Sequence, residues 1–206
     1  MESFKESNKV SAAILAGGLN KRFNGKTKAN IQISGVRIIA RTIKVLHEIF
    51  DDIIIVTNTP EEFKGYNHFT LVADEIKNVG PLGGIHAAMK VAKNEAIFVF
   101  ASDMPCISSD LVKKHLEFYH KRTCDAAIPR IKDFKEPLHS IYNRRILNDL
   151  DEFLKGTNKY SIENFLHDLN VRYHNLEDKE EYKKAFVNIN TPNDLSCMEL
   201  YALAHS

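Results

Sequence analysis

The chain has 206 residues, of which 44% are hydrophobic and 27% charged, a composition typical of a globular protein with a buried core. The net charge of +1 gives no electrostatic reason to expect nucleic acid or an anionic membrane as a partner. The three cysteines form no CxxC pair, no segment has the apolar length of a signal peptide or membrane span, and no linker or repeat divides the chain. We therefore expect a single cytoplasmic domain over residues 1–206, with its core at about 10–200.

Apolar runs alternate with amphipathic segments along the chain. Runs typical of buried strands lie at 10–16, 53–57, 70–73 and 96–101, and further strands are expected at 125–129, 139–142 and 171–174, with another short segment at 187–190. Helical spacing is found at 38–50, 82–92, 108–121, 145–155 and 161–167, and again from Thr191 or Pro192 onward. This order predicts an α/β fold: a mostly parallel, Rossmann-like sheet with helices on both faces and a less regular, mixed second half.

Polar or glycine-rich segments follow four of the predicted strands. A glycine pair follows 10–16, Asn58 follows 53–57, Asp74 follows 70–73, and Asp103 follows 96–101. In open α/β sheets, ligands bind beyond the carboxyl ends of the strands. The sequence therefore predicts one binding site that gathers these four features.

The glycine-rich loop is the strongest of the four features. It reads Leu15-Ala16-Gly17-Gly18 and continues to Arg22 and Lys28. Glycines let backbone N–H groups approach an anion, and the two basic side chains can bind phosphate oxygens. Gly25-Lys26-Thr27 matches the end of the phosphate-loop motif G-x-x-x-x-G-K-[ST] of kinases and NTPases. The motif also needs a glycine at position 20, where this chain has Asn20. The adjacent glycines also exclude the G-x-G-x-x-G dinucleotide fingerprint.

The pattern L-A-G-G-x-x-x-R-x-x-x-x-x-K resembles the signature of the sugar-nucleotide and cofactor nucleotidyltransferases. The rest of the chain is similar to the molybdenum cofactor guanylyltransferases. Four further segments carry this resemblance: Asp74 with Gly80-Pro81-Leu82-Gly83-Gly84, Ser102-Asp103-Met104-Pro105, Glu136 to Tyr142, and Val187 to Leu195. The chain departs from the family at Phe23-Asn24, where methionine and glycine are common, and at Thr27, where aspartate is usual.

The resemblance and the residue chemistry together predict the site residues. The predicted catalytic residues are Arg22, Lys28 and Asp103. The predicted nucleotide-binding residues are Leu15, Ala16, Gly17, Gly18, Lys28, Asn58, Asp74, Gly83 and Asp103. Asp103 is also the predicted ligand of Mg²⁺, the expected cofactor, because magnesium prefers oxygen ligands.

Four of these residues also have a structural alternative. Asp103 could cap the next helix, but Ser108 is better placed for that role. Asp74 and Asn58 are also ordinary turn residues, and Gly83 could serve a tight helix–sheet turn. In the segment from 187 to 195, Asn190 or Thr191 is expected to cap the last helix. His139 is expected to have a surface or packing role.

The predicted function is the transfer of GMP from GTP to the terminal phosphate of molybdopterin or Mo-molybdopterin, with release of pyrophosphate. The resemblance also implies other cofactor-biosynthesis proteins or molybdoenzymes as partners. Two alternatives remain open from the residues. One is a related nucleotidyltransferase that uses CTP or another phosphorylated acceptor. The other is a nucleotide-binding protein of the same fold without catalytic activity.

Overall fold

The structure is a computed structural model that describes residues 9–17, 27–156 and 159–204. Within these ranges, eight strands form one sheet. They are β1 (Val10–Leu15), β4 (Ile53–Val56), β5 (Thr70–Val72), β6 (Ala96–Ala101), β7 (Ala126–Ile131), β8 (Phe134–Lys135), β9 (His139–Asn143) and β10 (Val171–Asn175). A separate small hairpin joins β2 (Gln32–Ile33) to β3 (Val36–Arg37).

The helices alternate with these strands along the chain. The α-helices are α1 (Ile38–Leu46), α2 (Pro81–Val91), α3 (Ser109–His120), α4 (Leu147–Gly156), α5 (Ile162–Leu166), α6 (Glu180–Ala185) and α7 (Pro192–Ala204). Three 3-10 helices are η2 (Lys28–Asn30), η3 (Pro60–Tyr66) and η4 (Arg144–Ile146). No helix among the described residues combines the length and the apolar character needed to cross a bilayer.

The sheet is parallel in its first half and mixed in its second half. Its order is β10-β7-β9-β6-β1-β4-β5, with β8 paired to β7. Strand β1 runs parallel to both β4 and β6, whereas β9 is antiparallel to β6 and β7. Strand β10 is parallel to β7. The predicted fold class, mostly parallel with a less regular second half, is confirmed.

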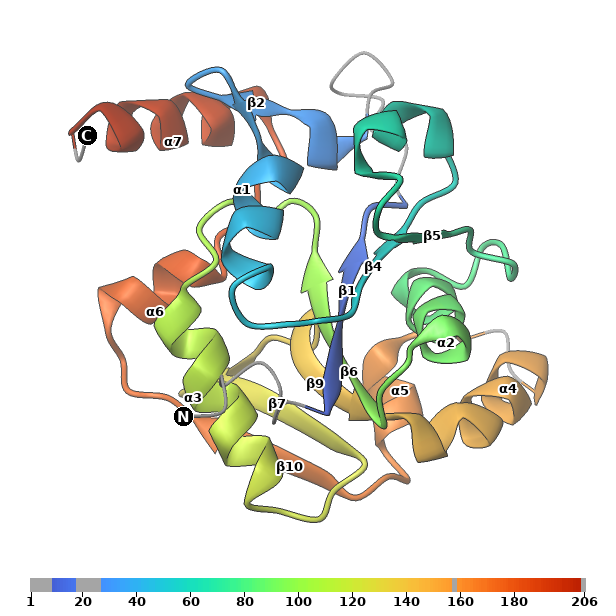
Figure 1. Ribbon diagram of the computed structural model, residues 1–206. Coiled ribbons are helices and arrows are strands. Elements are labelled where there is room, and N and C mark those ends of the chain that lie inside the picture. Colours follow the sequence, from blue (N-terminus) through green and yellow to red (C-terminus); the bar gives the residue numbers. More distant parts are fainter. Residues whose placement is uncertain (1–8, 18–26, 157–158, 205–206) are drawn as a thin grey trace.

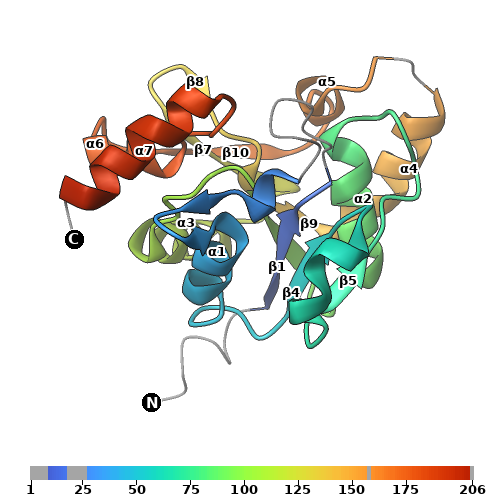
Figure 2. The same ribbon diagram turned by 90° about the horizontal axis from the view of Figure 1, so that it is seen from above.

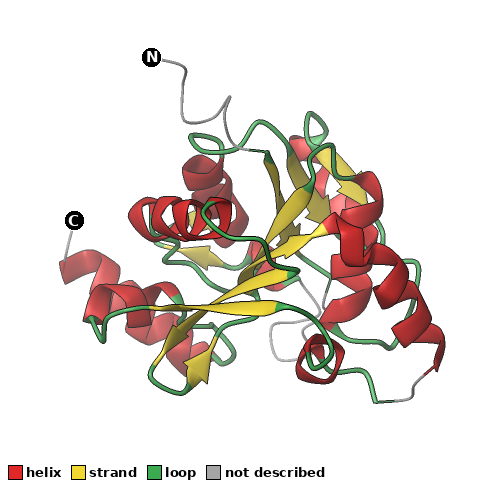
Figure 3. Ribbon diagram, turned by 90° about the horizontal axis from the view of Figure 1, so that it is seen from below, coloured by secondary structure: helices red, strands yellow, loops and turns green. Residues whose placement is uncertain are grey.

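Helices cover both faces of the sheet (Figures 1 and 3). Helices α1 and α3 pack on one face, where Phe50 makes edge contacts with Phe98 and Phe100, each with ring centroids 6.1 Å apart. Helices α2, α4 and α5 pack on the other face, around buried Ile97, Val99 and Tyr142. Burial on both faces explains why the sequence of β6 is an uninterrupted apolar run.

Several segments differ from the sequence-based prediction. The helix expected over 38–50 ends at Leu46, and the next residues form a turn. This turn still buries Ile49 and Phe50, so the apolar spacing in the sequence continues beyond the end of the helix. Residues 187–190 form no strand, although Ile189 is fully buried. Helix α6 and the 3-10 helix η3 were not predicted, because each is short and carries several charges.

Candidate active site

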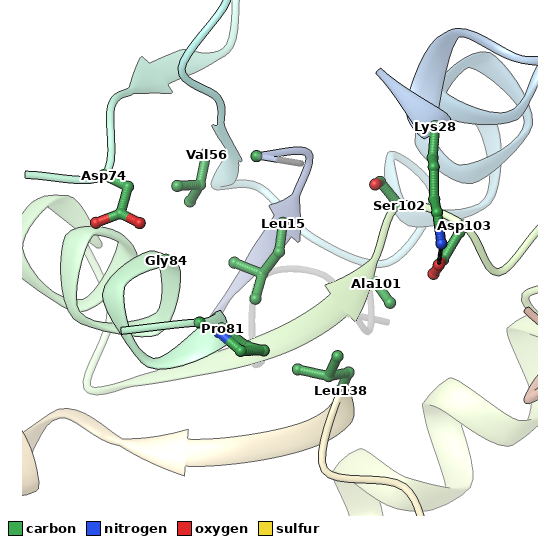
Figure 4. Close-up of a pocket in the computed structure, with 12 residues that line it drawn as sticks. Leu15, Lys28, Val56, Asp74, Pro81, Gly84, Ala101, Ser102, Asp103 and Leu138 are labelled. Atoms are coloured by element: carbon green, nitrogen blue, oxygen red, sulfur yellow. Dashed lines mark hydrogen bonds and ion pairs between the residues drawn. The ribbon is translucent and has the colours of Figure 1, made fainter. Parts of the chain in front are cut away.

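A cleft opens beyond the carboxyl ends of β1, β4 and β6, where open α/β sheets bind ligands. Its volume is about 330 Å³. Figure 4 shows Lys28 and Asp103 on one side, Asp74 on the other, and Leu15 between them. The lining residues are Leu15, Gly17, Lys28, Val56, Asp74, Gly80, Pro81, Gly84, Ala101, Ser102, Asp103 and Leu138.

Lys28 and Asp103 form an ion pair at one end of this cleft. Lys28 lies on η2, and Asp103 follows β6; the Lys28 Nζ atom is 2.8 Å from Asp103 Oδ2. The two side chains are 26% and 17% exposed, so the pair is partly shielded from solvent. An ammonium and a carboxylate at the edge of a cleft provide complementary groups for phosphate oxygens and a cation.

Glu62 of η3 holds the short helix η2 in place through hydrogen bonds. The Glu62 Oε2 atom accepts hydrogen bonds from the Thr27 hydroxyl at 2.8 Å and from the Asn30 amide at 2.9 Å. Burial alone would raise the pKa of Glu62, but these hydrogen bonds outweigh it and hold the pKa below its usual value. Thr27, the departure from the family pattern next to Lys28, is therefore buried against Glu62.

The C-terminal segment completes the Lys28 end of the cleft. The Lys28 Nζ atom donates to Asn190 Oδ1 at 2.5 Å, and the Ile189 N–H donates to the carbonyl of Asp103 at 2.9 Å. Of the two expected caps of α7, Thr191 does accept from the Asp194 N–H, at 3.2 Å. The side chain of Asn190 instead contacts Lys28, a role that local spacing did not reveal.

Asp74 and the start of α2 form the opposite end of the cleft. The Asp74 carboxylate accepts from the Ile76 N–H at 3.0 Å and lies against Gly83, where a Cβ atom would be 2.5 Å from Oδ1. Gly80, the residue before α2, has a φ of +62°, which favours glycine. Burial raises the pKa of Asp74. This partly buried side chain lines the cleft, where its oxygens can accept hydrogen bonds from a ligand.

Asn58 lies behind the glycine turn. Its Oδ1 accepts from Lys77 Nζ at 2.6 Å, and its Nδ2 is 3.6 Å from where a Cβ of Gly17 would stand. Lys77 also donates to the carbonyl of Asp74, so it links the ends of β4 and β5. Asn58 therefore lies beside the cleft without lining it.

Glu136 is a buried acid that sequence reasoning did not single out. Its side chain accepts from the Leu138 N–H at 3.1 Å, and Leu138 lines the cleft. Burial, with a contribution from the negative charge of Asp103, raises the pKa of Glu136 to about 7. The raised pKa follows from tertiary burial, which a single glutamate in a sequence does not reveal.

The structure thus brings most of the predicted site residues together. Leu15, Gly17, Lys28, Asp74 and Asp103 line the cleft. Ala16 is buried and donates its N–H to Val56, and Gly83 packs behind Asp74. His139 is fully buried among aromatic rings, as expected for a packing role. The remaining two, Gly18 and Arg22, lie outside the described residues.

Comparison with known proteins agrees with this architecture. Residues 12–172 match the family model of the MobA-like NTP transferase domain. The molybdenum cofactor guanylyltransferase of Syntrophotalea carbinolica is 33% identical over 89% of this chain and 88% of its own. That of Desulfosudis oleivorans is 31% identical over 92% and 94%.

A solved structure shows the same likeness in three dimensions. The molybdopterin-guanine dinucleotide biosynthesis protein A of Archaeoglobus fulgidus is 28% identical and superposes with a TM-score of 0.78, over 95% of this chain and 100% of that one. The family match covers more than half of the chain, and the curated relatives exceed 30% identity over most of it. The chain is therefore a nucleotidyltransferase that belongs to the MobA-like, molybdenum cofactor guanylyltransferase family.

Proposed function

We propose that the protein transfers GMP from GTP to the terminal phosphate of molybdopterin or Mo-molybdopterin. An acceptor phosphate oxygen forms a bond to the α-phosphorus of GTP. The bond from the α-phosphorus to the oxygen that leads to the β-phosphate breaks, and pyrophosphate leaves with that electron pair. The observation that carries the proposal is the cleft itself, with the Lys28–Asp103 pair at one end and the partly buried Asp74 at the other.

Asp74 supports guanine as the base. Guanine presents two adjacent donors, N1–H and N2–H, which match the two oxygens of a carboxylate. Cytosine presents a single exocyclic amine, and the edge of adenine pairs a donor with an acceptor. A base held by Asp74 would lie near Leu15 and the start of α2, and its phosphates would extend toward Lys28.

Lys28 would stabilise the phosphates of the nucleotide and the departing pyrophosphate. Both reactants are anions, so the barrier includes charge repulsion that an ammonium lowers. Asn190 accepts from Lys28 and would keep the ammonium directed into the cleft. Arg22 and the backbone of Gly17 and Gly18 would complete the phosphate contacts. Catalysis by these residues consists of positioning and electrostatic stabilisation.

The residues at the Lys28 end fit a magnesium ion. No group of three His, Cys, Asp or Glu side chains among the described residues is arranged to hold a metal. Of the described residues that line the cleft, Asp103 is the one carboxylate at this end, and magnesium is often held by one carboxylate together with substrate phosphates. Asp103 would hold the ion, which would supply positive charge to the phosphate oxygens.

The test of this function is pyrophosphate release from GTP in the presence of molybdopterin and Mg²⁺. Asp103→Ala is expected to abolish most of this release, and unchanged turnover would contradict the metal assignment. A thermal-shift panel of GTP, CTP, ATP and UTP tests the base, and preferential stabilisation by CTP would favour a related enzyme. GTP binding without release for any acceptor would favour a non-catalytic protein.

The protein would act in the cytoplasm. The described cysteines form no disulfide, which fits a reducing compartment such as the cytoplasm. The dinucleotide product would pass to other cofactor-biosynthesis proteins or to molybdoenzymes.

A further inference from the structure

The helix η2, which begins with Lys28, lacks a side-chain cap of its own. Thr27 stands at its N-cap position, where a side-chain oxygen usually accepts from an unpaired N–H of the first turn. The Thr27 side chain makes no such hydrogen bond. Its oxygen accepts from the Asn30 side-chain amide at 2.9 Å instead, and its hydroxyl donates to Glu62 of η3. Figure 2 shows η3 in teal beside strands β4 and β5, which it connects.

Glu62 supports η2 through one carboxylate oxygen. Glu62 Oε2 accepts from the Thr27 N–H at 3.3 Å, from the Thr27 hydroxyl at 2.8 Å and from the Asn30 amide at 2.9 Å. Hydrogen bonds to an ionised acceptor are about twice as strong as neutral ones. Thr27 is 2% exposed, so water competes little for its two donors. The carboxylate thus holds the residue before Lys28 and the residue two positions after it.

A second contact joins η3 to the region of Lys28. The Arg37 guanidinium donates to Asn30 Oδ1 at 3.4 Å and lies 5.2 Å from the ring centre of Tyr66, the last residue of η3. Asn30 is therefore held at its amide by Glu62 and at its side-chain carbonyl oxygen by Arg37. Phe63, which lies between Glu62 and Tyr66 in sequence, is fully buried in the core. Helix η3 is thus anchored in the core and supports η2 from two of its residues.

The contacts of η3 fix the main chain of Lys28, whereas Asp103 and Asn190 hold its Nζ atom. A lysine side chain is a flexible four-carbon stem, so the place of its ammonium depends on where the main chain lies. Misplacing such a group by about 1 Å can cost about a hundredfold in rate. The described residues that line the cleft do not include Glu62. The effect of Glu62 on a bound nucleotide would therefore pass through Lys28.

We propose that Glu62 is a positioning residue for nucleotide binding and transfer: it holds the main chain on both sides of Lys28, so that the ammonium meets the phosphates of the nucleotide. The inference rests on the proposed function, which assigns those phosphates to Lys28. It adds a residue outside the cleft on which nucleotide affinity and the rate of transfer depend. It also makes η3 a part of the phosphate-binding structure.

A double-mutant cycle on GTP affinity tests this role. Glu62→Ala, Lys28→Met and the double variant are compared with wild type by calorimetry with GTP and Mg²⁺, and folding is followed by circular dichroism. Glu62→Gln keeps the size of the side chain and takes the place of Glu62→Ala in the cycle if that variant unfolds. Glu61→Ala is the matched control, because Glu61 is the neighbouring acid of η3 and is exposed.

A rescue variant separates positioning from a general loss of structure. Thr27→Asp is combined with Glu62→Ala, so that a carboxylate at position 27 replaces the lost acceptor. The Thr27 oxygen already accepts from the Asn30 amide, and aspartate is among the best N-cap residues. This variant should support η2 without Glu62.

Glu62→Ala is expected to weaken GTP binding about fivefold, and Lys28→Met about tenfold. Because Glu62 acts through Lys28, the double variant should match Lys28→Met within about twofold and should not show the product of the two losses, about fiftyfold. Glu61→Ala should bind GTP as wild type does. The rescue variant should return to within about twofold of wild type.

Two results would overturn the role of Glu62 and leave the proposed function intact. One is wild-type GTP affinity in a folded Glu62→Ala variant, and the other is losses that multiply in the double variant. A protein that shows the expected cycle but releases no pyrophosphate with molybdopterin would contradict the proposed function alone. A wild-type protein that binds no GTP would overturn both.

Discussion

The carboxylate of Asp74 occupies the space where any side chain at position 83 would begin. A Cβ atom at Gly83 would lie 2.5 Å from Oδ1 and 2.6 Å from Oδ2 of Asp74. The glycine therefore allows an acidic side chain from the end of β5 to pack against the first turn of α2. This contact determines where Asp74 points in the cleft.

Gly83→Ala is expected to weaken GTP binding about 10- to 100-fold, because the methyl group displaces the Asp74 carboxylate and disturbs hydrogen bonds to a charged acceptor. The free energy of unfolding should not fall in parallel, since alanine is favoured over glycine inside a helix by about 1 kcal/mol. GTP affinity by calorimetry and thermal unfolding separate the two effects.

The matched control is Gly65→Ala, where a Cβ atom meets nothing within 4 Å. This variant should bind GTP as wild type does. Equal GTP affinity in Gly83→Ala and Gly65→Ala would show that Asp74 does not contact the nucleotide in this orientation.

Lys28 is expected to oppose metal binding when no nucleotide is present. Its ammonium lies 2.8 Å from Asp103 Oδ2 and partly neutralises the carboxylate that would hold the ion. Lys28→Met should therefore bind Mn²⁺ alone about tenfold more tightly while it binds GTP more weakly. Electron paramagnetic resonance of free Mn²⁺ measures the first change without any turnover.

Two further variants serve as controls for the Mn²⁺ measurement on Lys28→Met. Lys77→Met removes the same charge at the opposite side of the cleft and should leave Mn²⁺ binding unchanged. Asp103→Asn should abolish Mn²⁺ binding. If Lys28→Met binds Mn²⁺ no better than wild type, the metal does not bind at Asp103.

Asn190 is expected to contribute to turnover through Lys28. Its Oδ1 accepts from Lys28 Nζ at 2.5 Å, so Asn190→Ala frees the ammonium to adopt other rotamers. The expected result is a fall in kcat of about tenfold or more with a small change in the KM for the acceptor. Steady-state pyrophosphate release provides both constants.

Thr191→Ala serves as the comparison for Asn190, because Thr191 caps α7 without contacting Lys28. It should reduce thermal stability and leave kcat near wild type. A similar loss of kcat in both variants would mean that Asn190 acts only through the docking of α7.

His139 is expected to make stability depend on pH. Its ring is fully buried, and its centroid lies 5.2 Å from those of Phe98 and Phe100. Neither ring nitrogen has a hydrogen-bond partner among the described residues. Burial lowers the pKa of His139 from the ordinary 6.5 to about 3. The unfolded chain therefore binds a proton that the folded chain does not, between these two values.

As the pH falls through this window, the free energy of unfolding should fall, by up to about 1.4 kcal/mol per pH unit for this one proton. His139→Phe removes the titrating group and keeps an aromatic ring, so it should reduce the slope by that amount. Urea unfolding at several pH values between 6.5 and 4 measures the slope. If the free energy of unfolding changes equally with pH in wild type and His139→Phe, His139 is not the source of the pH dependence.

Local sequence patterns determined most of the secondary structure of this protein. The run at 96–101 became β6 with the predicted bounds, because an apolar stretch of this length has few other ways to be buried. Ser108 caps α3 through the Leu111 N–H, as its place before the helix predicts. The four polar strand ends met at one edge of the sheet because the first strands are parallel.

The tertiary structure alone decided several contacts between distant side chains in the site. Asn190 and Lys28 are separated by 162 positions in sequence, and Glu62 supports Thr27 from 35 positions away. Hydrophobic spacing records which residues are buried within a segment, but not which other segment covers them. Strand order, register and the docking of the C-terminal segment supply that information.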